Sequence, residues 1–221
     1  QTSTARDSTA QDVYDLLVKT IQTAPKVVLC DAGANDELIE WLESILGNEK
    51  IHIVETSKKS GDGINAHVHF ATQQLQGEQA AITAFKARLK EGKRVWISVG
   101  TVKAGRLIAQ ALRGCGRGVF IHSKTPTLTK KKFLESADRE SLNYDYVIAS
   151  PVISCGISVE HRDGHHFDDV FLVTDGSTIV PQGAIQTIRR VRYVKDVQIY
   201  TWLPFRQRLG DTTQEKRITD F

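Results

Sequence analysis

The sequence has 221 residues, a length that fits one large domain or one domain with part of another. Apolar residues make up 40% and charged residues 25% of the chain, which is ordinary for a globular protein and excludes a disordered or fibrous one. The net charge of +3 is too small to indicate a nucleic-acid partner by itself.

The first residues of the chain, its apolar runs and its cysteines indicate the compartment in which the protein is expected. Residues 1–10 are polar and lack a signal-peptide core, and no apolar run reaches the roughly 20 residues that cross a membrane. The chain contains no Met, so we expect a fragment of a longer protein with further motifs upstream. Cys30, Cys115 and Cys155 are odd in number and form no C-x-x-C motif. They predict neither a disulfide framework nor a zinc site, and they fit a reducing compartment such as the cytoplasm.

The first 63 residues are predicted to form two helices and two strands. Apolar residues at Val13, Leu16, Leu17 and Ile21 predict a helix over residues 11–23. The apolar runs 26–31 and 51–55 are interpreted as buried strands, with a second helix between them that Asn35 or Asp36 would cap. The polar segment 57–63 (SKKSGDG) predicts a boundary between residues 1–63 and 64–221.

Beyond the boundary the pattern alternates regularly between strands and helices, which predicts a mostly parallel sheet with helices on both faces. The strands are predicted over residues 64–72, 94–99, 118–122, 144–149, 169–174 and 197–202, and the helices over residues 78–90, 102–112, 129–137 and 181–193.

Two segments in fixed order carry the strongest functional signal, residues 144–160 (YDYVIASPVISCGISVE) and 186–192 (QTIRRVR). Ligands of parallel sheets bind at the carboxyl ends of strands. A strand that ends in Ser150, with Gly156 six residues later, can place a hydroxyl and a bare backbone there. We expect the arginines of the second segment on the helix after Pro181, where a planar guanidinium can meet phosphate charge.

These segments resemble the fifth and sixth motifs of superfamily 2 helicases, and most closely those of the herpesvirus origin-binding and plasmid and phage replication helicases. Ser150 and Gly156 match the fifth motif, in which Ser158 replaces an Asp. In the sixth motif Gln186 and Arg190 match. Arg189 replaces a Gly, Tyr193 stands where the second Arg would be, and Arg192 lies one residue earlier.

The resemblance implies an α/β fold, a RecA-like doubly wound mostly parallel sheet, with a remnant of the first lobe in residues 1–63 and the second lobe in residues 64–221. Residues 94–101 (RVWISVGT) also resemble the fourth motif of these helicases. The resemblance implies catalytic roles for Arg190 as an arginine finger and for Arg192 and Gln186, nucleotide contacts from Gly156, Ser158 and Arg189, and nucleic-acid contacts from Gly100, Thr101, Lys103, Ser123, Lys124, Thr125 and Ser150.

The implied activity is ATP-dependent translocation on DNA, single-stranded or forked, in replication initiation, with ATP and Mg²⁺ bound between two lobes of the complete protein. The chain contains no G-x-x-x-x-G-K-[ST] loop, so we expect no hydrolysis without the missing first lobe. No membrane partner is expected. The setting would be the cytoplasm or wherever viral or plasmid replication takes place.

Several alternatives stay open. Residues Asp31 to Gly33 fit the third motif better than the magnesium-binding second one, and they can also be a plain turn. Each basic cluster can be a solvated face. The histidines and aspartates of residues 161–169 match no metal motif and are interpreted as a surface loop, although a metal-dependent nuclease would use such residues. A non-catalytic α/β nucleic-acid-binding module is the main alternative to the helicase.

Overall fold

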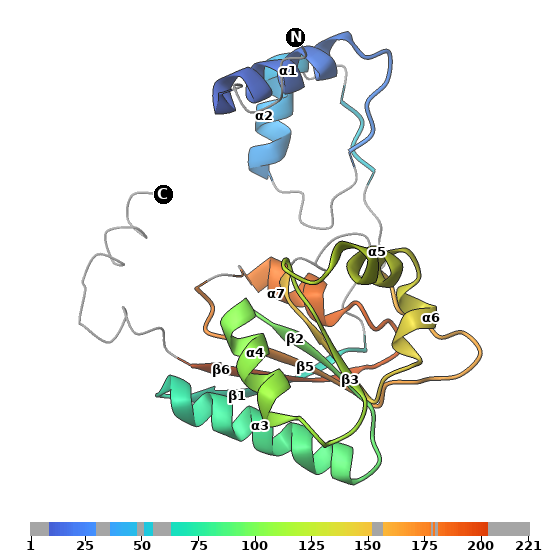
Figure 1. Ribbon diagram of the computed structural model, residues 1–221. Coiled ribbons are helices and arrows are strands. Elements are labelled where there is room, and N and C mark those ends of the chain that lie inside the picture. Colours follow the sequence, from blue (N-terminus) through green and yellow to red (C-terminus); the bar gives the residue numbers. More distant parts are fainter. Residues whose placement is uncertain are drawn as a thin grey trace. The chain divides into compact units, whose positions relative to one another are not determined.

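The computed structural model describes residues 9–29, 36–47, 51–54, 63–151, 157–177, 179 and 181–202. Contacts between residues divide the chain into two compact units, Gln1–Lys59 and Ser60–Phe221. The sequence places the boundary after residue 63 instead. Each unit is described on its own (Figure 1).

The first unit contains the two predicted helices, α1 (Ala10–Thr23) and α2 (Asp36–Leu46). Thr9 caps α1 because its hydroxyl accepts from the Asp12 amide while the Asp12 carboxylate accepts from the Thr9 amide. Trp41 Nε1 of α2 donates to the Tyr14 hydroxyl of α1 at 2.8 Å. Gln22 Nε2 of α1 also donates to Ile45 O of α2 at 3.1 Å, so two hydrogen bonds and one ring-to-ring contact link the two amphipathic helices.

The two strands predicted in this unit are wrong where the structure describes them. Residues 26–29 and 51–54 belong to no strand. A strand exists only when a neighbour takes up its backbone hydrogen bonds, and the described part of the unit offers neither run a partner. The apolar character of the runs remains: Val28 is 68% exposed and Val54 is 93% exposed.

The second unit confirms the predicted α/β fold. Six strands form one sheet in the order β1-β6-β5-β2-β4-β3, and every neighbouring pair is parallel. The strands are β1 (Asn65–Ala71), β2 (Val95–Val99), β3 (Gly118–Ile121), β4 (Tyr146–Ala149), β5 (Asp169–Thr174) and β6 (Asp196–Trp202).

Helices cover both faces of this sheet (Figure 1). On one face α3 (Gln74–Lys90) and α4 (Val102–Ala111) pack through Phe85 and Ile108 against alternate sheet residues such as Ile97. On the other face α5 (Thr127–Glu135), α6 (Ala137–Ser141) and α7 (Pro181–Ile188) cover a core that includes Trp96 and Phe133. Central strands buried on both faces explain why β2 is apolar at four of its five positions, VWISV.

Two helix predictions need correction. The single helix predicted over residues 129–137 is two helices, α5 and α6, because Ser136 between them has φ −145° and ψ 49°. The helix predicted over residues 181–193 ends at Ile188. It ends early because Val191 is drawn into a parallel bridge with Val159. None of the helices in the described ranges is long and apolar enough to cross a bilayer.

Candidate functional site

One group of the predicted site residues lies where the strands end, at the side of the sheet that we call its carboxyl edge; the opposite side, where the strands begin, is the amino edge. Because β2, β4 and β3 are parallel neighbours, the residues that follow them meet at one edge. Gly100 follows β2, and its amide donates to Val173 O of β5 at 2.8 Å. Ser150 follows β4, and its amide donates to Ile121 O of β3 at 3.1 Å. These bonds fix the backbone of both exits.

The exit from β2 leads directly into the amino terminus of α4. The Thr101 hydroxyl caps the helix by accepting from the Ala104 amide at 3.1 Å. The first turn of α4 carries no acidic residue, and Lys103 there is exposed. Free amides and a lysine at a helix amino terminus favour an anion such as a phosphate. Thr101 is thus a structural cap, while Lys103 is open to a ligand.

The exit from β3 is a tight turn over residues 122–125. The Thr125 hydroxyl accepts from the His122 amide at 2.9 Å, and the Thr125 amide donates to His122 O at 3.0 Å. Lys130 Nζ of α5 donates to Ser123 O at 3.3 Å. Thr125 is buried by these contacts, so its hydroxyl shapes the turn, whereas Ser123 and Lys124 are exposed at its tip.

Positive charge gathers around this turn. Burial lowers the pKa of His122, and the nearby cations Arg106, Lys124 and Lys130 lower it further. The neutral ring accepts from the Lys124 amide through Nδ1 at 3.2 Å. Arg106 comes from α4 and Lys130 from α5, so two helices and one turn build the cluster. A cluster of this kind can hold the phosphates of a nucleic-acid backbone.

Ser150 is the most buried of the predicted contacts at this edge. It is 2% exposed, and its hydroxyl has no hydrogen-bond partner among the residues that the structure describes. A buried hydroxyl without a partner is costly, so such groups are commonly met by a ligand, by water or by a neighbouring segment. Gly156, the next predicted position of this motif, lies outside the described residues.

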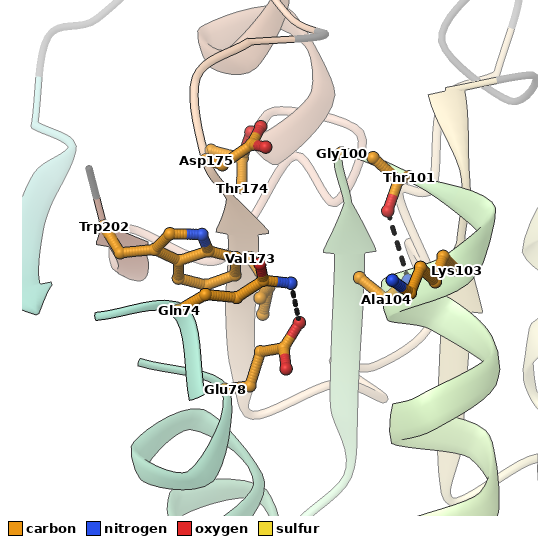
Figure 2. A pocket seen from close by; sticks show the side chains of 10 residues that line it. All are labelled: Gln74, Glu78, Gly100, Thr101, Lys103, Ala104, Val173, Thr174, Asp175 and Trp202. Carbon is orange, nitrogen blue, oxygen red and sulfur yellow. Dashed lines mark hydrogen bonds between the residues drawn. The ribbon is translucent and has the colours of Figure 1, made fainter. Parts of the chain in front are cut away.

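A small pocket opens beside α4 at the same edge, with a cavity volume of about 30 Å³ (Figure 2). Predicted and unpredicted residues line it together: Gln74, Glu78, Gly100, Thr101, Lys103, Ala104, Val173, Thr174, Asp175 and Trp202. The sequence analysis missed the acidic side, where Gln74 Nε2 donates to Glu78 Oε1 at 2.8 Å. A signal existed for Asp175 and Trp202, because each stands at the carboxyl end of a predicted strand.

The second group of predicted residues surrounds a contact between the two motif segments. Val159 and Val191 form an isolated parallel bridge. The Val159 amide donates to Arg190 O at 2.7 Å, and the Arg192 amide donates to Val159 O at 2.9 Å. Segments about 30 residues apart are thereby held side by side.

The arginines lie after α7 and not on it, contrary to the sequence-based expectation. Arg190 Nη1 donates to Ile157 O at 3.0 Å, and its side chain is half-buried. Arg192 is exposed, and its Nε donates to the Ser158 hydroxyl at 3.0 Å. Arg189 is half-buried in the turn after the helix, and Gln186 is exposed on α7. Two guanidinium groups therefore converge on residues 157–158.

Tyr193 occupies the position where the helicase motif has its second arginine, and it has a structural role. Its hydroxyl accepts from the amides of Phe167 at 2.9 Å and His166 at 3.1 Å. With both lone pairs used, the hydroxyl donates to His161 Nδ1 at 2.7 Å. His161 Nε2 must then carry the proton and donate to Asp138 O at 2.9 Å. Burial lowers the pKa of His161 and raises the pKa of Tyr193, so both stay neutral.

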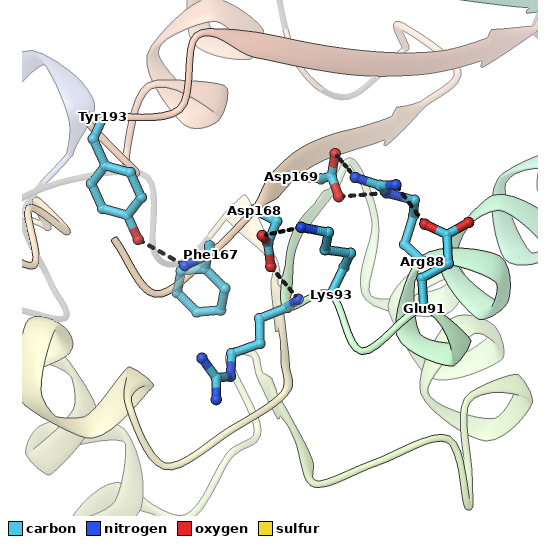
Figure 3. Close-up of polar contacts among 8 residues, drawn as sticks. Arg88, Glu91, Lys93, Phe167, Asp168, Asp169 and Tyr193 are labelled. Carbon is cyan, nitrogen blue, oxygen red and sulfur yellow. Dashed lines mark hydrogen bonds and ion pairs between the residues drawn. The ribbon is translucent and has the colours of Figure 1, made fainter. Parts of the chain in front are cut away.

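Asp168 and Asp169, at the start of β5, pair with cations at the amino edge of the sheet (Figure 3). Asp169 accepts from Arg88 Nε at 2.7 Å and from Arg88 Nη2 at 3.1 Å. Asp168 accepts from Lys93 Nζ at 3.0 Å and from the Arg94 amide at 2.8 Å. Within the described ranges, no group of three His, Cys, Asp or Glu side chains has the arrangement of a metal site. Asp31 to Gly33 lie outside those ranges.

Comparison with known proteins gives one curated relative and a set of solved structures. No protein-family profile matches the chain. The replication origin-binding protein of Human herpesvirus 2 (strain HG52) is 25% identical over 214 residues, which cover 85% of this chain and 23% of that protein. The chain therefore spans about a quarter of the length of this relative.

Among solved structures, S. cerevisiae Dbp5 bound to RNA and ADP BeF3 superposes with a TM-score of 0.59 at 16% identity, over 97% of this chain and 55% of Dbp5. A Dbp5 variant bound to Gle1 and IP6 gives a TM-score of 0.55 at 16% identity, over 96% of this chain and 53% of that one. At this identity the likeness shows the fold alone, which is that of the RecA-like domains of helicases.

Proposed function

We propose that this chain is the second RecA-like lobe of a superfamily 2 nucleic-acid helicase of replication-initiation type, preceded by the end of its first lobe. The observation that carries the proposal is the Val159–Val191 bridge, because it fastens the fifth-motif segment to the sixth-motif segment. The 25% identity to a replication origin-binding protein supports DNA as the nucleic acid.

The carboxyl edge would hold the nucleic-acid backbone. Lys103 and the amino terminus of α4 offer one anion site, and Lys124 with Arg106 offers another at the neighbouring turn. The Ser150 hydroxyl follows β4, the strand between β2 and β3, and is proposed to donate to a phosphate oxygen. Contacts of this kind are made to phosphates and not to bases, so binding should be salt-sensitive and largely independent of sequence.

The arginine segment would act on nucleotide bound between this lobe and the first. ATP and Mg²⁺, when bound in the complete protein, supply the phosphoryl group and the metal that shields its charge. Arg190 is the proposed finger, with Arg192 beside it as the exposed guanidinium. In this chain Arg190 Nη1 also donates to Ile157 O, which holds the guanidinium beside the segment that contains Ser158. Gln186 on α7 is the remaining proposed contact.

The first unit supports the presence of a larger first lobe. Leu16 on α1 is 65% exposed, Val28 is 68% exposed and Val54 is 93% exposed. The apolar runs around α2 have the strand–helix–strand spacing of a parallel βαβ unit but lack strand partners in the described residues. Additional strands of the same lobe would pair with them and cover these residues.

The test is DNA-stimulated ATPase activity of this chain beside a version extended upstream to include a phosphate-binding loop. We expect turnover only in the extended protein. In that protein Arg190→Ala should abolish stimulated turnover and keep DNA binding, while Arg113→Ala, at an exposed position after α4, should leave both unchanged. Binding without turnover in every version would favour a non-catalytic nucleic-acid-binding module, and unchanged turnover of Arg190→Ala would remove Arg190 from the mechanism.

A further inference from the structure

Strand β1 is the outer strand at one side of the described sheet. It pairs along all seven residues with β6, and no other strand within the described ranges pairs with it (Figure 1). Six of its residues are exposed, including Val68 at 62% and Phe70 at 59%. Long apolar edge strands recruit another strand unless a charge, a proline, a bulge or a short length prevents it. The sequence NAHVHFA has no lysine, no acidic residue and no proline, whereas the opposite edge strand, β3, has only four residues.

The free edge has a defined hydrogen-bonding register. The Asn65 amide donates to Lys195 O on the β6 side, so the backbone groups of Asn65, His67 and His69 point toward β6. Because N–H and C=O groups alternate in direction along a strand, those of Ala66, Val68 and Phe70 point away from the sheet. An incoming strand would therefore bond to these three residues.

The side chains of the strand complement a second copy of themselves. The strand is nearly palindromic about Val68, with a histidine on either side and then a small Ala66 facing a large Phe70. If two copies pair antiparallel about a two-fold axis at Val68, the two valines lie opposite each other. Ala66 then lies opposite Phe70 of the second copy, so a small side chain packs beside a large one on the same face of the sheet as Val68. Both pairings use the outward backbone groups, and neither brings like charges together.

The neighbouring helix also permits this pairing. Helix α3 packs over both β1 and β6. With strands about 4.8 Å apart, the two copies of α3 would lie roughly 10 Å from each other, close to a normal helix-packing distance. Leu75 in the first turn of α3 is 63% exposed and available for such a contact.

We propose that β1 is the contact of a symmetric dimer of this chain, in which the two β1 strands pair antiparallel about Val68 and join two six-stranded sheets into one. On one face of the joined sheet the two copies of Val68 and Phe70 would cover each other beside Ile199 of β6. Such a dimer would present two copies of the carboxyl edge, and it would form whether or not the chain binds nucleic acid.

The test is sedimentation velocity of the chain over a range of concentrations. We expect a species of twice the 24.6 kDa chain mass at high concentration. Val68→Lys should weaken this association about tenfold or more, because it places two like charges opposite each other. Leu128→Lys, at an exposed leucine of α5 that is 83% exposed, is the matched control and should leave the association unchanged. A chain that stays monomeric throughout, or two lysine variants with equal effects, would overturn the proposal.

A cross-linking experiment tests the register separately from stability. Hydrogen-bonded antiparallel residues have Cα atoms about 5.5 Å apart, within the range that a disulfide spans. Oxidation of Val68→Cys should therefore give a covalent dimer that the wild-type chain, with its own cysteines, does not give. His67→Cys should cross-link poorly, because its two copies would be diagonal neighbours about 7–8 Å apart. Equal cross-linking of the two variants would rule out this register.

Discussion

Charged side chains lie at both the amino edge and the carboxyl edge of the sheet, but they have different roles there. At the amino edge, cations and carboxylates are matched: Arg88 holds Asp169 by two hydrogen bonds, and Lys93 holds Asp168. At the carboxyl edge, Lys103 and Lys124 are exposed, and neither forms an ion pair with a carboxylate among the described residues. In the sequence, both edges consist of charged loops that precede or follow strands. Composition alone therefore does not tell which of these charges are paired within the protein.

The difference shows where a ligand can gain free energy. The Arg88–Asp169 ion pair is already made within the protein and has little attraction left for a ligand. It holds the start of β5 against the end of α3. An unpaired lysine at a helix amino terminus keeps its full attraction for an anion. Substitutions of the paired charges at the amino edge should therefore change the free energy of unfolding, and substitutions of the lysines at the carboxyl edge should change ligand affinity.

The largest effect should come from Tyr193→Phe, which removes a hydroxyl that satisfies three groups. The amides of His166 and Phe167 and the Nδ1 atom of His161 would lose their partner. With roughly 1–3 kcal/mol for each buried group left unsatisfied and some relief from water, we expect a loss of about 3 kcal/mol in the free energy of unfolding. Urea unfolding followed by fluorescence measures it. Tyr14→Phe, at a residue of the first unit that is 43% exposed, should cost less than about 1 kcal/mol.

A smaller loss of stability is expected from Asp169→Asn. The substitution breaks a bidentate pair in which the Asp169 side chain is 19% exposed and that of Arg88 is 35% exposed. Partial solvent screening limits the cost to about 1–2 kcal/mol. Glu91→Gln removes the other carboxylate that Arg88 contacts, at 55% side-chain exposure, and should cost less than about 0.5 kcal/mol. Equal losses from the two variants would show that burial does not distinguish these pairs.

At the carboxyl edge, Lys124→Ala should leave the unfolding midpoint unchanged and weaken single-stranded DNA binding about fivefold at low salt, which is about 1 kcal/mol. The dependence of log affinity on log salt concentration should fall by about 0.7, the value for one phosphate contact on a single strand. Fluorescence anisotropy measures both quantities. Lys90→Ala, an exposed lysine at the end of α3, is the control. If it weakens binding as much, the two edges do not differ in the way proposed.

The smallest effect concerns pH. The pKa of His161 is lowered by burial, so below its unfolded-state value of about 6.5 the unfolded chain takes up a proton that the folded chain refuses. Stability from this residue is therefore complete above about pH 6.5 and declines as the pH falls toward the lowered value. His161→Gln should flatten the decline of the urea midpoint between about pH 7.5 and 5.5 relative to the wild-type chain. His52→Gln, outside the second unit, should leave that decline as it is.

The sequence predicted the second unit well because its signals are local. Each strand is a short apolar run and each helix an amphipathic stretch, so β2, β5 and α4 lie within a residue of their predicted bounds. The order of the motif segments along the chain could also be recognised from the sequence. Ser150, Gly100 and Lys103 could be placed at one edge because parallel strands have all their carboxyl ends on the same side. The two strands predicted in the first unit had equally good local patterns, and their described residues, 26–29 and 51–54, still form no strand.

Long-range contacts decided what the sequence could not show. Whether an apolar run becomes a strand depends on a neighbour elsewhere in the chain, which residues 26–29 and 51–54 lack among the described residues. The end of α7 was set by the pairing of Val191 with Val159, and the role of Tyr193 by three partners more than 25 residues away. The sequence by itself determined the α/β pattern and the chemistry available at each strand end, because both follow from neighbouring residues. The tertiary structure alone decided which of those polar groups are used up within the protein and which remain open to a ligand.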